Sequence, residues 1–205
     1  MAAVRSDGPE AARTKLVLAH GAGASIDSPF LEHIASALGG RGIRVVRFEF
    51  PYMEARRHGR KPPPDREPVL RAAWRDVIAA EGGGDRLVIG GKSLGGRMAS
   101  LVADELQVRA LVCLGYPFHP PGKPERLRVA HLAELRTPTL IVQGSRDPFG
   151  APDEVARYEL SRAIRIHWIE DGDHSLKPRA RSGRTERQNL DEAVEAVAEF
   201  LGELD

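Results

Sequence analysis

Short runs of Val, Ile and Leu recur along the chain and constrain its fold more than any other feature. Several are apolar at successive positions, as expected for parallel strands that helices cover on both faces. An antiparallel strand with one face in water would instead alternate apolar and polar residues. The runs that we expect to be strands are 16–19, 45–50, 87–89, 110–114, 139–142 and 164–169.

The segments between these runs have the 3.6-residue periodicity of amphipathic helices. The expected helices are 29–38, 68–80, 94–105, 152–161 and 186–201. Alternating strands and helices predict a doubly wound, mostly parallel α/β sheet of about six strands, with helices on both faces. Ligands of such sheets bind outside the carboxyl ends of the strands, so the residues just after each run are the first candidates for a site.

The length of 205 residues fits one domain, and 41% hydrophobic residues are enough for a core. Residues 1–13 mix Gly, Pro and charge without periodicity, so we expect a flexible arm followed by a single domain over 14–205. The 30 basic and 29 acidic residues leave a net charge of +1, which favours neither nucleic acid nor a membrane as a partner.

Targeting and redox signals are weak. The N-terminal residues lack the apolar stretch of a signal peptide, and no later segment approaches the ~20 apolar residues of a membrane span. Cys113 is the only cysteine and lies in an apolar run, so we expect it to be a buried side chain that packs like a small apolar residue. We expect a cytoplasmic protein; its oligomeric state stays open.

A Gly-Lys-Ser-Leu-Gly turn joins the 87–89 run to the helix expected from residue 94. This is strand, G-x-S-x-G, helix, the pattern of a nucleophile elbow. The glycines at 91 and 95 remove side chains that would clash in so tight a turn, and the turn exposes Ser93 at a helix N-terminus. Ser93 is therefore the predicted nucleophile.

A serine hydroxyl needs a base, which in turn needs a group to orient it. Asp147 follows the run at 139–142, and His174 follows the run at 164–169. The chain order of serine, acid and histidine is that of the nucleophile-elbow hydrolases. We therefore expect Asp147 to orient His174. Three other acids stay open: Asp153, which also suits the N-cap of the next helix, and, less favoured because they share the histidine's loop, Asp171 and Asp173.

Acyl transfer also needs backbone N–H groups that stabilise an oxyanion. One candidate is Leu94, directly after the nucleophile, where the helix dipole helps. The other is Ala22, in the His-Gly-Ala-Gly-Ala segment after the first run, where small residues let the backbone approach a substrate. His20 is expected to hold this loop in place, not to act as a base.

Together these segments resemble the α/β-hydrolase superfamily, in particular small bacterial hydrolases related to dienelactone hydrolases. The group is also similar to the hydrolase-like domain of a subunit of the non-specific-lethal chromatin complex. The resemblance runs from about residue 16 onward and rests on the segments LAHGAGASIDSPF, VVRFEFPYM, IGGKSLGGRMAS, LGYPFHPPGKPE, QGSRDPFG and DGDHSLKP. It implies the same triad in a minimal α/β-hydrolase fold, and in so short a chain we expect no lid domain inserted between strands. Dienelactone hydrolases have cysteine where this chain has Ser93, which favours ester over lactone hydrolysis.

The expected function is hydrolysis of a small carboxylic ester or thioester through an acyl-enzyme, without metal or cofactor. The alternative is a binding or scaffold protein that kept the fold and lost turnover, as the chromatin-complex resemblance suggests. Two stretches, 54–66 with Arg56, Arg57, Arg60 and Lys61, and 177–187, are basic enough to attract an anion, although solvated loops are the commoner meaning. Candidates to line an acyl pocket are Tyr52, Met53, Phe118 and Phe149.

Overall fold

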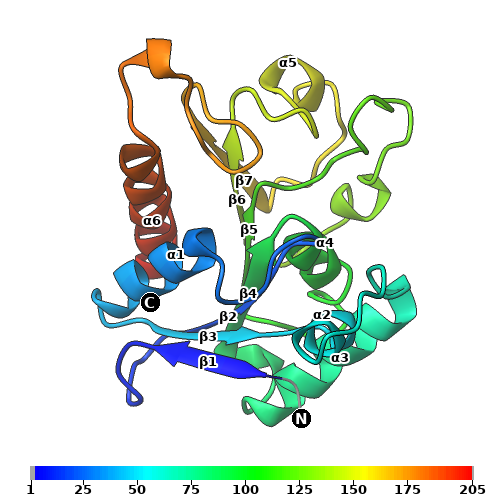
Figure 1. Ribbon diagram of the computed structural model, residues 1–205, viewed down its shortest axis with the longest axis vertical. Coiled ribbons are helices and arrows are strands. Elements are labelled where there is room, and N and C mark those ends of the chain that lie inside the picture. Colours follow the sequence, from blue (N-terminus) through cyan, green and yellow to red (C-terminus); the bar gives the residue numbers. More distant parts are fainter. Residues whose placement is uncertain (1–2, 205) are drawn as a thin grey trace.

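A seven-stranded sheet forms the centre of the computed structural model, which describes residues 3–204 (Figure 1). The strand order is β1-β3-β2-β4-β5-β6-β7, with β1 antiparallel to β3 and all other neighbours parallel. The strands are β1 (Val4–Asp7), β2 (Lys15–Ala19), β3 (Arg44–Phe48), β4 (Leu87–Lys92), β5 (Ala110–Leu114), β6 (Thr139–Gly144) and β7 (Ile164–Ile169). The predicted fold class is confirmed, and no lid domain is present in this part of the chain.

Helices cover both faces of the sheet (Figure 1). They are α1 (Pro29–Gly39), α2 (Pro51–Arg57), α3 (Glu67–Ala80), α4 (Leu94–Ser100), α5 (Pro152–Val155) and α6 (Glu186–Gly202). Helices α1 and α6 lie together on one face, whereas α3 and α4 lie on the other. Short 3₁₀ turns occur at Gly84–Arg86, Ala130–Leu132 and Ala180–Ser182.

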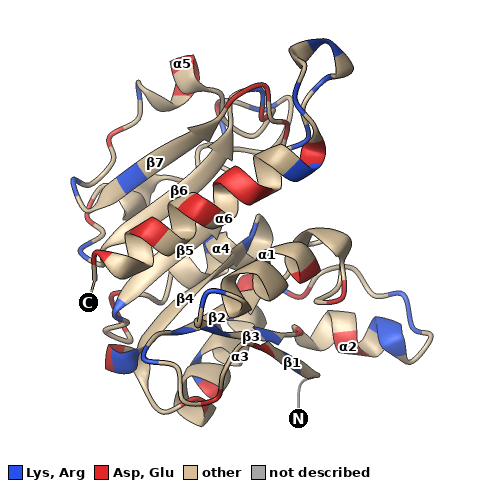
Figure 2. Cartoon of the chain, turned by 90° about the vertical axis from the view of Figure 1, so that its left-hand side faces the viewer, with Lys and Arg blue, Asp and Glu red and all other residues tan. Residues whose placement is uncertain are grey.

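Each central strand contributes to two apolar cores. In β2, Val17 and Ala19 face the core under α3 and α4, whereas Leu16 and Leu18 face the core under α1 and α6. Successive side chains of a strand point to opposite faces, so a strand covered on both sides must be apolar throughout. Accordingly, β5 and β6 contain no charged residue, and the charges lie mostly on helices, loops and the outer strands (Figure 2).

Strand β1 corrects the expectation of a flexible arm for residues 4–7. It pairs with β3 along its whole length, from Val4 opposite Phe48 to Asp7 opposite Val45. Its side chains are largely exposed, so the apolar pattern of a buried strand is missing. Backbone pairing at the sheet edge stabilises it instead, together with an ion pair at 3.0 Å between Asp7 and the buried Arg47.

The helices differ from expectation in three places. Helix α2 occupies part of the stretch read as a basic loop, and Pro51 begins it, a position where proline is favourable. The helix expected over 94–105 leaves α-helical geometry after Ser100 and continues as turns, and the one expected over 152–161 ends at Val155. Helix ends depend on local hydrogen bonds that a periodic pattern does not record.

Candidate active site

The turn after β4 holds Ser93 in a strained conformation, with φ 51° and ψ −111°. Positive φ is uncommon for residues other than glycine and concentrates at functional sites. A hydrogen bond at 3.0 Å from the Ser93 N–H to the Leu114 carbonyl holds the turn on the neighbouring strand. Ser93 lines a cavity outside the carboxyl edge of the sheet.

Two glycines make this turn possible. A Cβ atom on Gly91 would lie 2.3 Å from the carbonyl oxygen of Ala19 in β2, and one on Gly95 would lie 2.4 Å from the same oxygen. Both distances are far inside van der Waals contact. Only glycine at these positions lets β4 and α4 lie this close to β2, as the motif predicted.

The structure brings Ser93, His174 and Asp147 into one hydrogen-bonded chain. His174 Nε2 lies 2.9 Å from Ser93 Oγ, and its Nδ1 lies 2.8 Å from Asp147 Oδ2. Because a carboxylate only accepts hydrogen bonds, Nδ1 carries the hydrogen and Nε2 is left to accept the serine proton. The Asp147 side chain is fully buried, whereas that of His174 is 22% exposed. This arrangement suits a serine activated by a neutral imidazole.

Asp147 is held by two further donors. Gln143 Nε2 donates to Oδ2 at 2.9 Å, and the Phe149 N–H donates to Oδ1 at 2.9 Å. Gln143 also binds the N–H and the carbonyl of Tyr116, so it is fixed between β5 and β6. No sequence motif assigned a role to Gln143; the signal for it is its position near the end of β6, four residues before the acid.

The other candidate acids have different partners. Asp171 binds the Arg179 guanidinium, which lowers the pKa of Asp171 to about 2, and Asp173 accepts the N–H groups of Ser175 and Lys177. Asp153 is exposed in the first turn of α5.

The expectation that Asp153 caps α5 is wrong. The N-cap residue is Ala151, and the Glu154 side chain accepts its N–H at 2.9 Å. Asp147 is thus the acid that meets His174.

The loop after β2 is anchored by its carbonyl groups. Tyr52 Oη lies 3.2 Å from the carbonyl oxygens of both Gly21 and Ala22, so its single hydrogen is shared between them. His20 Nδ1 donates to the Gly21 carbonyl at 2.7 Å, while Nε2 accepts the Phe50 N–H at 3.1 Å. Burial lowers the pKa of His20, so the ring is neutral and fully hydrogen-bonded. His20 therefore holds the loop, as expected.

This anchoring orients the Ala22 N–H. The Gly21 carbonyl and the Ala22 N–H belong to one trans peptide, so they point in opposite directions. With the carbonyl bonded to His20 and Tyr52, the N–H points away from these buried groups, and Ala22 itself lines the cavity. Leu94 is the first residue of α4, so its N–H has no acceptor within the helix.

A cavity of about 310 Å³ lies over Ser93. Of the four predicted lining residues only Phe149 lines it, with its ring stacked on His174 at 4.1 Å between centroids. The prediction is wrong for Tyr52, Met53 and Phe118, which are buried in the core under α3 and α4. The loop after β2 lies at the cavity, as expected, whereas the sequence reading missed the lining residues of α1. The full lining comprises Gly21, Ala22, Gly23, Ala24, Ser28, Phe30, Leu31, Lys92, Ser93, Phe149, His174 and Ser175.

Two arginines of the basic stretch at 54–66 are engaged within the chain, whereas Arg60 and Lys61 are exposed. Arg56 donates to the Pro62 carbonyl at 2.8 Å and also reaches the Ala22 carbonyl. Arg57 forms two hydrogen bonds, at 2.6 and 2.7 Å, with the buried carboxylate of Glu49. These arginines support α2 and the loop after β2 rather than facing solvent unpaired.

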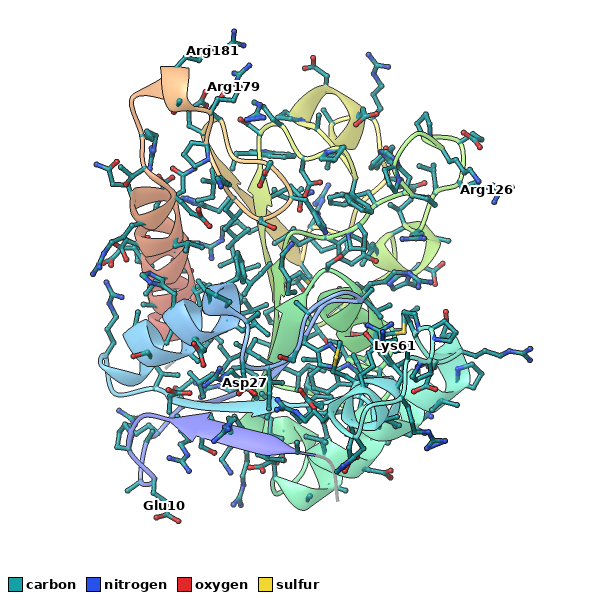
Figure 3. The ribbon with its side chains drawn as sticks, in the orientation of Figure 1. Glu10, Asp27, Lys61, Arg126, Arg179 and Arg181 are labelled. Carbon is teal, nitrogen blue, oxygen red and sulfur yellow. The ribbon has the colours of Figure 1, made fainter. Side chains whose placement is uncertain are left out.

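The second basic stretch, 177–187, lies elsewhere. Figure 3 shows Arg179 and Arg181 at one tip of the molecule, far from Lys61 beside α2 and α3. Arg179 is paired with Asp171. The two stretches therefore do not form one continuous basic surface.

Comparisons with known proteins agree with the fold. The family model described as an alpha/beta hydrolase domain matches residues 12–202. No helix among the described residues is long and apolar enough to span a bilayer.

Three solved structures illustrate the similarity of fold. Est1E from Butyrivibrio proteoclasticus with bound ferulic acid superposes with a TM-score of 0.74 at 16% identity, over 99% of this chain and 95% of that one. An alpha-beta serine hydrolase homologue from Coxiella burnetii gives 0.69 at 19%, over 94% and 90%. XC6422 from Xanthomonas campestris, a serine hydrolase without a lid, gives 0.64 at 21%, over 94% and 88%.

Proposed function

Because the chain belongs to the alpha/beta hydrolase family, we propose that it is a serine hydrolase that cleaves small carboxylic esters or thioesters. The observation that carries this proposal is the hydrogen-bonded chain from Ser93 through His174 to Asp147, which opens into the cavity. The strained elbow and the low exposure of Asp147 support it, since both cost stability and suit a preorganised nucleophile.

In the proposed reaction Ser93 Oγ attacks the ester carbonyl carbon while His174 Nε2 takes the hydroxyl proton. The tetrahedral oxyanion is stabilised by the N–H groups of Leu94 and Ala22. The imidazolium then gives its proton to the leaving alcohol or thiol, and an acyl-enzyme remains. Water, deprotonated by the same nitrogen, then attacks the acyl carbon. The bond from that carbon to Ser93 Oγ breaks, the imidazolium returns its proton to Ser93, and the acid is released. Asp147 holds the imidazole tautomer and stabilises its charged form throughout.

The cavity suggests the size of the substrate. Its volume of about 310 Å³ is at the lower end of the range for small-molecule sites, and half of its lining residues are glycine, alanine or phenylalanine. We therefore propose a short acyl group next to Phe149 and the 21–24 loop.

Labelling with a fluorophosphonate probe tests the proposal, because only an activated serine reacts. We expect one adduct, on Ser93, located by mass spectrometry of the digested protein. A panel of p-nitrophenyl esters of graded chain length, with thioester and amide analogues, then defines the bond and chain length. Absence of both labelling and turnover would contradict the proposal and favour a binding protein that kept the fold.

Replacing Tyr52 by phenylalanine tests the anchored loop. The change removes the hydroxyl that binds the Gly21 and Ala22 carbonyls but keeps the buried ring. Loss of an oxyanion donor lowers kcat about 10²- to 10³-fold. Tyr52→Phe removes only the hydroxyl that holds the loop of the Ala22 donor, so we expect kcat to fall roughly 10-fold with little change in KM. Tyr158→Phe, which removes a hydroxyl outside the cavity, should retain full activity. Equal kcat values for the two variants would show that Tyr52 does not position the loop.

A further inference from the structure

Lys92 is the residue just before the nucleophile, and its side chain lines the same cavity. Among the described residues that line this cavity it is the only Lys or Arg, and none is Asp or Glu. The remaining walls are glycines, alanines, serines and apolar side chains, apart from His174. The cavity therefore contains one fixed charge, and that charge is positive.

The ammonium of Lys92 is not paired with a carboxylate in the described part of the chain. Its Nζ donates to the backbone carbonyl of His174 and lies 5.4 Å from the centroid of the Phe30 ring. The nearby carboxylates are otherwise engaged, since Asp147 binds His174 and Asp173 binds backbone N–H groups. An ammonium has three N–H donors, so one carbonyl leaves it able to bind a further acceptor.

The backbone leaves space for this group. A Cβ atom on Gly115 would lie 2.7 Å from Lys92 Nζ, so a side chain there would displace the ammonium. Burial lowers the pKa of Lys92 to about 8, which still leaves most molecules protonated at pH 7. A partly desolvated cation without a counterion is costly, and an incoming anion would offset that cost.

We propose that Lys92 binds a carboxylate of the substrate, so that esters with a carboxylate close to the scissile bond are preferred over neutral esters of the same shape. This inference rests on the proposed function, because it places the carboxylate next to Ser93. The same contact can serve an acyl chain that ends in a carboxylate or an alcohol that carries one. The experiment distinguishes these two sources.

Two isosteric pairs of esters isolate the charge. On the acyl side, p-nitrophenyl hemisuccinate is compared with p-nitrophenyl 4-methylpentanoate. On the alcohol side, 4-acetoxybenzoate is compared with 4-isopropylphenyl acetate. Each is assayed with the wild type, with Lys92→Met, which keeps an unbranched side chain without charge, and with Lys61→Met, which removes an exposed lysine outside the cavity.

We expect Lys92→Met to lower kcat/KM for the anionic member of one pair about 10- to 100-fold more than for its neutral partner. Lys61→Met should leave both unchanged. The pair that responds identifies the side of the ester on which the carboxylate lies. If Lys92→Met lowers both members of each pair equally, Lys92 only holds the His174 loop and the inference is wrong. It is also wrong if neither member changes.

A binding measurement separates this inference from the proposed function. Calorimetric titration of Ser93→Ala with the same esters, with and without Lys92→Met, needs no turnover. If Ser93→Ala binds the anionic esters more tightly and Lys92→Met removes this preference, carboxylate binding by Lys92 is supported. This holds even if the wild type hydrolyses no ester, because absence of hydrolysis would overturn only the hydrolase proposal. Equal binding of both members by Ser93→Ala would overturn the role of Lys92 even in an active hydrolase.

Discussion

Ser93→Ala should lower kcat for ester hydrolysis by roughly 10⁵- to 10⁶-fold, the size of effect known for removal of a serine nucleophile. The change deletes one oxygen at the cavity wall, together with its hydrogen bond to His174. It removes no core volume and keeps a Cβ in the same backbone conformation, so the melting temperature should stay close to that of the wild type.

The measurement for Ser93→Ala is kcat on p-nitrophenyl esters, beside a thermal unfolding curve. Ser36→Ala, an exposed serine in α1, serves as the matched control and should keep full activity. Hydrolysis by a contaminating esterase can be recognised by treating the wild type with the fluorophosphonate probe. Activity of the protein itself should fall in proportion to the fraction of Ser93 labelled, whereas contaminant activity would not. Turnover above about 1% of the wild-type rate in pure Ser93→Ala protein would exclude Ser93 as the nucleophile.

Asp147→Asn should lower kcat by roughly 10⁴-fold, as for the corresponding acid of a serine protease. The carboxylate accepts hydrogen bonds from His174, Gln143 and the Phe149 N–H. An asparagine replaces one acceptor oxygen by an NH₂ group, which would face an N–H donor instead of accepting its hydrogen bond. The substitution therefore disfavours the histidine tautomer that has its hydrogen on Nδ1. We also expect a loss of stability of about 1–3 kcal/mol, since a buried donor is left without an acceptor.

Asp153→Asn is the control for this prediction. Asp153 is exposed, and it is the Glu154 side chain that binds the N–H of the N-cap residue of α5, so neither activity nor melting temperature should change appreciably. Rates are compared per folded molecule, with the folded fraction taken from the unfolding curve at the assay temperature. If Asp147→Asn kept the wild-type kcat, Asp147 would not be the acid that orients His174.

The sequence was sufficient to identify the sheet and the edge at which the site lies. Six apolar runs predicted six of the strands, because a strand that is covered on both faces needs apolar residues at successive positions. The carboxyl ends of parallel strands meet at one edge, so Ser93, Asp147 and His174 were expected together from their places after β4, β6 and β7. The structure brings these three side chains within hydrogen-bond distance.

Other features depend on contacts between distant segments. Strand β1 has no apolar pattern, and its pairing partner β3 lies about forty residues away along the chain. The sequence predicted that Tyr52, Met53 and Phe118 line the pocket. This prediction failed because a sequence does not show to which side of the backbone a side chain points. Burial instead directs the Tyr52 hydroxyl to the carbonyls of the 20–24 loop.

The acid that orients His174 shows most clearly which features follow from the sequence and which depend on contacts between distant segments. The amino-acid sequence was enough to show that an aspartate was available after β6 or in the histidine loop, because residue types and positions are local properties of the chain. The choice among them follows from the fold, which places the Asp147 carboxylate against the imidazole, pairs Asp171 with Arg179 and leaves Asp153 exposed. Asp171 meets Arg179, Asp173 meets its own loop, and Asp147 alone meets His174 among the described residues.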